Sequence, residues 1–287
     1  MSRAVQPLLF RFLLPGLIAA TSLFSSVQAQ NNDYMPHYRR QAYRGVLRLV
    51  GGAGLGYYGG EFRANLMKNI ALRPNINLGV SYRLTQHISL RGELGAYRLS
   101  GSDVGGINEH RNLSFRTDNP EGYVAVVYNL FPYTQLSAYN VYVLGGVGLT
   151  HINPKAKLKN RYYSLPRLRT EGVAYARNAV MIPVGMGISR RIKYGFDVAL
   201  EMRFTYTMTD YLDDVSTVYP QEGSIDSFAQ VFSDRSAEAG FPANPAGAKR
   251  GDSSSNDGYL FAQLRFERTI GSSRKAIRKA QLKCFKP

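Results

Sequence analysis

The chain has 287 residues, a formal net charge of +16 and a single cysteine. Its length suffices for one large all-β domain or two small ones, and one cysteine excludes an internal disulfide. After Leu23 no apolar run approaches the ~20 residues that a membrane-spanning helix needs. A mature chain that crosses a membrane must therefore do so as a closed barrel.

The N-terminal residues predict export. Arg3 precedes an apolar run from Leu8 to Leu23, and residues 27–29 (VQA) have the small residues of a signal-peptide cleavage site. We therefore expect a signal peptide over residues 1–29 and a polar periplasmic segment over 30–44. Export makes lipid phosphates, acidic surface sugars or a protein partner better matches for the positive charge than nucleic acid.

Alternation of apolar and polar residues predicts eight strands. It is clearest over residues 194–207, where every second residue from Tyr194 to Tyr206 is apolar or aromatic and the intervening set is small, polar or charged. This length exceeds the usual ~5–6 residues of a soluble strand and the ~9–11 of a tilted membrane strand. Pro183 cannot donate to a ladder, so we expect a bulge or a water there. The predicted strands are 45–58, 74–82, 88–98, 122–131, 138–150, 179–189, 194–207 and 259–268.

The connections between these strands alternate in length. The long ones are 59–73, 99–121, 151–178 and 208–258, and the short ones are 83–86, 132–137 and 190–193. Outer-membrane barrels have an even strand count, short periplasmic turns and long outer loops, whereas a β-sandwich has no reason to sort its loops by length. We predict an all-β fold, an eight-stranded antiparallel transmembrane β-barrel over residues 45–271 in a Gram-negative outer membrane, with both termini periplasmic.

The inward faces of the predicted strands carry four charges of each sign. An eight-stranded barrel is just wide enough for its own side chains, and buried charges must be paired or they cost several kcal/mol each. The balance predicts a closed, ion-paired lumen rather than a pore, with a proton or solute path as the alternative. The predicted lumen network is Arg48, Arg91, Glu93, Asp197, Glu201, Arg203, Arg265 and Glu267.

Residues 54–59 match the dinucleotide pattern G-x-G-x-x-G. That pattern requires a strand before it, a helix after it and a parallel unit around it. Here the glycines lie in a predicted antiparallel strand, where they permit close packing or a bend in a narrow barrel. We therefore predict no nucleotide cofactor.

The remaining candidates for chemistry are weak. No histidine has a second histidine at metal-ligand spacing. His151 with Ser100 or Ser102 makes a conceivable lipid-cleaving set, but such a set is recognised by geometry. Residues 210, 213 and 214 are aspartates that we interpret as solvated, with too few oxygens for Ca²⁺. We predict no metal, no cofactor and no enzymatic activity, and a lipid A-modifying enzyme is the less favoured alternative.

The C-terminal residues 272–287 form a basic tail without an acidic residue. One interpretation is a frayed tail that lies on anionic headgroups. The other is a docking arm for a periplasmic partner, in which Cys284 is available for an intermolecular disulfide in the oxidising periplasm. The basic residues of the tail are Arg274, Lys275, Arg278, Lys279, Lys283 and Lys286.

Six segments carry a resemblance to a known family. They are LGYYGG at 55–60, RP at 73–74, YRLSGSD at 97–103, NLFPY at 129–133, INPKA at 152–156 and TDYLDDVS at 209–216. On these segments the chain resembles the PorG-like outer-membrane barrels of the type IX secretion system of the Bacteroidetes, over about residues 45–266. The resemblance implies a non-enzymatic barrel attached to the periplasmic ring of a lipoprotein and its partner protein.

We therefore expect a structural barrel that anchors this ring to the outer membrane through its periplasmic face and its tail. The family motif does not dictate the tail, so the placement of the contact there is our own inference. Outer-membrane lipids are the second expected partner. The alternative function is surface adhesion or defence through the long outer loops.

Overall fold

A computed structural model of the chain describes residues 45–60, 62, 71–132, 139–193 and 195–270. The predicted signal peptide (1–29), the segment 30–44 and the basic tail (272–287) with Cys284 lie outside these residues.

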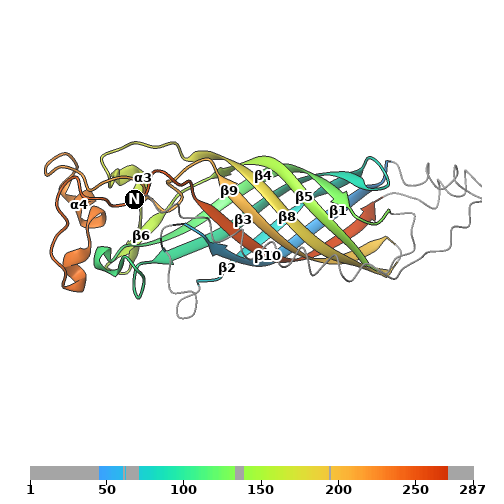
Figure 1. Cartoon of the computed structure of the whole chain (residues 1–287), viewed down its shortest axis with the longest axis horizontal. Coiled ribbons are helices and arrows are strands. Elements are labelled where there is room, and N and C mark those ends of the chain that lie inside the picture. Colours follow the sequence, from blue (N-terminus) through green and yellow to red (C-terminus); the bar gives the residue numbers. More distant parts are fainter. Residues whose placement is uncertain (1–44, 61, 63–70, 133–138, 194, 271–287) are drawn as a thin grey trace, which may run out of the picture. The chain divides into compact units, whose positions relative to one another are not determined.

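Eight long strands form a closed antiparallel barrel (Figure 1). Around the barrel the order is β3-β2-β1-β10-β9-β8-β5-β4, and a pairing between β3 and β4 closes the ring. Closure leaves no unpaired strand edge in the barrel wall. The strands are β1 (Leu47–Tyr58), β2 (Arg73–Arg83), β3 (Ile88–Ser102), β4 (Ser114–Asn129), β5 (Tyr139–His151), β8 (Asn178–Lys193), β9 (Phe196–Thr207) and β10 (Gly258–Ile270). The predicted fold class is confirmed.

Alternation along each strand sorts the side chains into two faces, as the sequence predicts. On β9 the odd-numbered residues from Asp197 to Thr207 are buried in the lumen, and Leu200, Met202 and Tyr206 are exposed on the outer wall. The outer wall as a whole carries exposed apolar side chains. They include Leu49, Leu55, Ile76, Leu78, Leu94, Val124, Val126, Val147, Leu149, Val184, Ile188, Leu264 and Phe266.

The connections are sorted by length between the two ends of the barrel. The end with residues 84–87, 130–138 and 194–195 is named the turn end, and the opposite end, with 59–72, 103–113, 152–177 and 208–257, is named the loop end. Within the long connections lie η1 (Glu109–Arg111), β6 (Lys155–Leu158), β7 (Arg161–Ser164), α3 (Leu165–Leu168), α4 (Ser227–Ser233) and η2 (Ser236–Ala239). No helix in the described part of the chain is long and apolar enough to cross a membrane.

The second long connection is much shorter than predicted. β3 continues to Ser102 and β4 already begins at Ser114, whereas the sequence predicts a loop over 99–121. The reason is that the outward positions of this stretch are charged or polar (Arg98, Arg116 and Asp118). The apolar half of the alternation, on which the prediction depends, is therefore absent there.

Pro183 interrupts one ladder without shifting it. The pairing of β8 with β5 stops between Val184 and Met181 and resumes in the same register, while Pro183 remains paired to Thr205 on the β9 side. Of the two expected arrangements the bulge is absent, because the ladder loses two pairings and keeps its register. The water stays a prediction. The register shift of β8 lies instead between Arg191 and Lys193 at the turn end.

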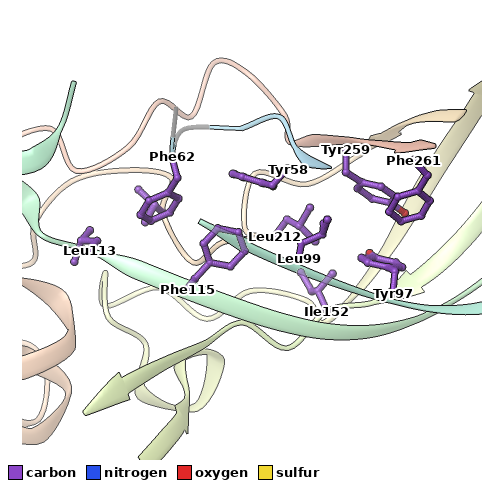
Figure 2. Close-up of a cluster of buried hydrophobic side chains, with 11 residues drawn as sticks. Tyr58, Phe62, Tyr97, Leu99, Leu113, Phe115, Ile152, Leu212, Tyr259 and Phe261 are labelled. Carbon is purple, nitrogen blue, oxygen red and sulfur yellow. The ribbon is translucent and has the colours of Figure 1, made fainter. Parts of the chain in front are cut away.

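The main apolar core lies inside the loop end, where barrel strands meet the long connections (Figure 2). Tyr97 packs against Tyr259 with ring centroids 4.7 Å apart, and Phe115 packs edge-on against Tyr58 at 4.9 Å. The cluster comprises Tyr58, Phe62, Tyr97, Leu99, Leu113, Phe115, Ile152, Leu212, Val215, Tyr259 and Phe261. Water is thus excluded from the loop end of the barrel by apolar side chains.

We predict that Gly54→Ala destabilises the barrel by about 1–3 kcal/mol, because overpacking forces backbone shifts. An added Cβ at Gly54 would lie 2.0 Å from the carbonyl oxygen of Ala262 and 2.7 Å from the Cα of Gln263. Gly92→Ala is the control, since its Cβ would meet no atom within 4 Å. Urea unfolding in lipid vesicles, followed by circular dichroism, measures both. Equal stability of the two variants would contradict the close approach of β1 and β10.

Candidate functional site

The predicted lumen residues nearest the turn end form ion pairs between β1, β9 and β10. Arg48 lies 2.5 Å from the Asp197 carboxylate and 2.7 Å from that of Glu267. Arg191, which is partly exposed, approaches Asp197 at 3.3 Å. These contacts connect strands on both sides of β10 through the barrel interior.

The middle of the lumen holds a denser set of pairs. Arg91 contacts Glu201 at 2.7 Å and Glu267 at 3.2 Å. Arg265 pairs with Glu93 and lies 3.2 Å from Glu201. The side chains of Glu93, Glu201 and Arg265 are fully inaccessible to solvent. These pairs join β3 to β9 and β10 across the lumen.

Tyrosine hydroxyls complete the coordination of these carboxylates. Tyr142 donates to Glu201 at 2.8 Å and Tyr123 donates to Glu93 at 2.7 Å. The guanidinium of Arg91 lies over the ring of Tyr142, 5.3 Å from its centroid. Buried charges are tolerated when their remaining hydrogen-bonding capacity is also used, and these rings supply part of it.

Arg203 has a partner that the sequence reasoning missed. It pairs with Glu121 of β4, which also accepts from the Tyr259 hydroxyl at 3.0 Å. The sequence prediction placed Glu121 in a loop because the start of β4 was set too late. Arg83 was missed as well, although it is buried at an inward position of β2. In the described part of the chain, the buried lumen charges are therefore five of each sign: Arg48, Arg83, Arg91, Arg203 and Arg265, with Glu93, Glu121, Asp197, Glu201 and Glu267.

The inward side chains of the described strands are buried against one another in the lumen. A polar cavity between Arg48, Ser81, Arg91 and Tyr142 measures about 10 Å³, about the space that one water molecule needs. The described lumen is thus a packed polar core. This arrangement joins strands to one another through the interior of the barrel.

Three long connections fold together over the loop end. We call the described parts of residues 103–113, 152–177 and 208–257 the cap. Arg111 of the first donates to the backbone carbonyl of Arg250 in the third, at 2.5 Å, and Arg250 donates to Glu171 of the second at 2.8 Å. Each connection thus contributes one member of a buried polar chain, so the three form one folded unit.

Glu171 accepts several hydrogen bonds from the last connection (208–257). Its carboxylate accepts from the backbone N–H groups of Ser216 and Thr217, both at 3.0 Å, and from the Thr217 hydroxyl at 2.7 Å. Together with the ion pair to Arg250, these bonds leave the buried carboxylate well satisfied.

Asp214 is buried next to that pair. Its carboxylate accepts from the Thr170 hydroxyl at 2.5 Å and from the Tyr175 hydroxyl at 2.6 Å. Burial raises the pKa of Asp214 from 3.8 to about 6, and Arg250 and the two hydroxyls oppose the rise. The backbone of Asp214 has φ +71°, a left-handed conformation that Asp and Asn adopt more readily than most residues.

Tyr58 joins the end of β1 to both ends of the last connection. Its hydroxyl lies 2.5 Å from Asp213 and 2.5 Å from Asp257. The second oxygens of these carboxylates accept backbone N–H groups, from Val215 at 2.9 Å and Leu212 at 3.0 Å. A phenol has one hydrogen to donate, so the hydroxyl can donate to one of these two carboxylates at a time.

The interpretation of Asp210, Asp213 and Asp214 as solvated is wrong. All three are buried, with exposed fractions of 7%, 1% and 1%. They follow a strand and carry no periodic pattern, so no sequence signal indicates that the other connections cover them. In the described residues no group of three His, Cys, Asp or Glu side chains could hold a metal ion.

The conceivable lipid-cleaving set is not assembled. The Nδ1 atom of His151 lies 2.7 Å from the Asn178 side-chain oxygen. Ser100 accepts from Arg73 at 2.7 Å, and the Ser102 hydroxyl accepts from the backbone of Val104 at 3.3 Å. Neither serine has His151 as its hydrogen-bond partner, and a nucleophile needs its base within such reach.

Together, the sealed lumen and the cap define the class of protein as a closed, eight-stranded antiparallel barrel with a folded cap. No family model and no curated protein matches the chain.

Among solved structures, the chain is similar to Neisserial surface protein A, with 8% identity, 78% of this chain and 97% of that chain covered and a TM-score of 0.42. It is similar to Ail, the attachment invasion locus protein of Yersinia pestis, with 10% identity, coverage of 79% and 98% and a TM-score of 0.39. It is also similar to OprG of Pseudomonas aeruginosa, with 7% identity, coverage of 80% and 99% and a TM-score of 0.39. At these values the likeness assigns neither a partner nor an activity to this chain.

We predict that Arg265→Met destabilises the barrel by about 3–5 kcal/mol, because it leaves Glu93 and Glu201 as buried charges short of a partner. Arg98→Met is the control. Its pair with Asp118 is more than one third exposed on both sides, so its loss costs at most about 1 kcal/mol. Urea unfolding in vesicles measures both, and an equal, small cost would mean that water reaches the lumen.

We predict that the cap becomes less stable as the pH rises from about 4 to about 6. The folded pKa of Asp214 is raised, so the folded cap binds a proton more tightly than the unfolded chain and loses this advantage across that window. Asp214→Asn tolerates the left-handed backbone and should remove the pH dependence. Hydrogen exchange of residues 208–257, corrected for intrinsic rates, measures it. An unchanged dependence in Asp214→Asn would assign the titration to another acid, and Asp252→Asn on the surface is the control.

Proposed function

We propose that this chain is an outer-membrane anchor: a non-conducting barrel that fixes a periplasmic assembly to the membrane. The apolar outer wall supports the membrane setting, because such a surface is unfavourable in water and matches the hydrocarbon of a bilayer. Short connections at the turn end and long ones at the loop end support a periplasmic turn end and an outer loop end.

The filled lumen is the observation that carries the proposal. Five charges of each sign are buried inside the barrel, and the cavity beside them measures about 10 Å³. A barrel filled in this way does not serve as a diffusion channel. Its work is therefore left to the surfaces that it presents on either side of the membrane.

We assign the periplasmic partner on the resemblance to the PorG-like barrels of the type IX secretion system. The partner is the ring lipoprotein with its companion ring protein, and the contact is made by the periplasmic face and the basic tail (272–287). The tail supplies positive charge for an acidic surface, and Cys284 is a thiol for an intermolecular disulfide. The protein has no catalytic step in this role.

A surface adhesion or defence function is the second candidate, and one observation favours it. The cap is a folded unit with its own buried polar network, and its outer surface exposes Phe228, Val231 and Phe241. A rigid loop platform is what a binding surface needs. Under this function the working surface is the cap, whereas under the anchor function it is the turn end and the tail.

We predict that the protein, reconstituted in a planar lipid bilayer, shows no conductance steps at moderate voltage. The expected result follows from the packed lumen. A wide porin inserted under the same conditions is the positive control. Stable conductance by this chain would contradict the filled lumen and so overturn the anchor function.

The partner assignment has its own test. Protein truncated after Gly271 should fail to recover the ring proteins in a pull-down, while Cys284→Ser should lose a high-mass band on a non-reducing gel and keep part of the binding. Phe228→Ser with Phe241→Ser is the matched control on the cap, because both side chains are exposed. If the cap variant loses adhesion while the truncated chain still recovers the ring proteins, the adhesion function is supported instead.

A further inference from the structure

The outer wall becomes basic where β3 and β4 rise above the apolar belt at the loop end. β6 pairs with β4 there, and β7 pairs with β6, so the sheet continues beyond the barrel rim (Figure 1). The outward side of this extension presents four cations and one acid. They are Arg98, Arg116, Lys155 and Lys157, with Asp118.

The distance from the turn end to these charges equals the thickness of the hydrocarbon layer of a membrane. On β3 the outward positions run from Ile88 to Arg98, and on β4 from Tyr128 to Asp118, ten residues in each case. Ten residues of a strand tilted by ~40° rise about 25 Å, the height of the apolar band on barrels of this kind. The cations therefore lie at the level of the headgroups when the belt lies in hydrocarbon.

Two of the cations are directly opposed in the sheet. Arg116 is the cross-strand partner of Lys155, and like charges in directly opposite positions are destabilising. Asp118 is engaged by Arg98 and lies 3.5 Å from Arg116. Among the described residues no acid forms an ion pair with Lys155 or Lys157, so the described part of this face keeps a net positive charge.

The guanidinium of Arg116 is held in place by an aromatic ring. It lies over Tyr162 of β7, 5.2 Å from the ring centroid. Tyr162 is 46% exposed, and tyrosine is favoured at the boundary between lipid and water. A positioned guanidinium fork is suited to phosphate oxygens.

We propose that this face binds the phosphate groups of an outer-leaflet lipid. The inference rests on the proposed placement of the barrel in a membrane with its loop end outward. A phosphate between Arg116 and Lys155 replaces their repulsion by two charge-assisted contacts, and the acyl chains lie along the apolar wall of β3 and β4, over Leu94 and Val124. The lipid therefore bears both the phosphate and the apolar chains, which a free anion does not.

The test is native mass spectrometry of the full protein purified from outer membranes in a non-ionic detergent. The probes are a glycolipid with two sugar phosphates, the same lipid without phosphates, and inorganic phosphate. Wild-type protein should prefer the phosphorylated lipid by at least about 10-fold. Arg116→Gln with Lys155→Gln should weaken its binding about 30-fold, the effect of two cations on an anionic lipid.

Matched variants separate the site from general charge. Arg190→Gln with Arg268→Gln removes two exposed cations at the turn end and should leave binding within about 2-fold. Arg116→Lys keeps the charge but loses the guanidinium fork, so its binding should lie between that of the wild-type protein and that of the double variant. A similar loss in both double variants, no preference for phosphate on the lipid, or displacement by inorganic phosphate at equal concentration would overturn the proposal.

The lipid-binding test and the tests of the anchor function can fail separately. Heat-dependent gel mobility shows whether each variant is folded, so a misfolded variant is not mistaken for a loss of binding. A protein that binds the lipid but conducts ions, or that recovers no ring proteins, ends the anchor function and leaves this site in place. A protein that recovers the ring but does not prefer the phosphorylated lipid ends the lipid site alone.

Discussion

The structure depends on one electrostatic constraint: charges enclosed in a narrow barrel must meet a partner of opposite sign. The lumen satisfies it with five arginines and five carboxylates, which lie on β1–β4, β9 and β10. Because ion pairs join β3 to β9 and β10 through the interior, the register of each strand is fixed by its neighbours and also by strands across the lumen. A slip of one residue would turn these charges to the outer wall.

The cap follows a different electrostatic rule. Its buried charged groups are six acids (Asp103, Glu171, Asp210, Asp213, Asp214 and Asp257) and two arginines (Arg111 and Arg250). The acids outnumber the arginines, and hydroxyl and backbone donors supply further hydrogen bonds, as at Asp214 and Glu171. Such donors compensate a carboxylate less fully than a guanidinium does. At Asp214 burial raises the pKa to about 6, and Arg250 with the two hydroxyl donors opposes this rise only in part.

The barrel was predictable from the sequence because apolar residues alternate with polar ones along each strand. The apolar set marks the outer wall and the polar set marks the lumen. The same reasoning identified eight of the lumen charges, since inward positions follow once the apolar face is known. It failed at Glu121, where the outward residues of β4 change from apolar to charged above the belt. It failed also in the cap, because the contacts of Glu171 and Arg250 join connections far apart in sequence and leave no periodicity.

A filled lumen limits what such a barrel can contribute. Under the proposed anchor function, the work is carried by the outer wall, the cap or the segments at the turn end. The outer wall changes along its height from apolar at Val124 to basic at Arg116. That gradient is costly in water and favourable across a leaflet, where hydrocarbon gives way to phosphate. In the proposed membrane placement, this change along the outer wall sets the depth of the barrel and therefore the distance of each of its ends from the membrane.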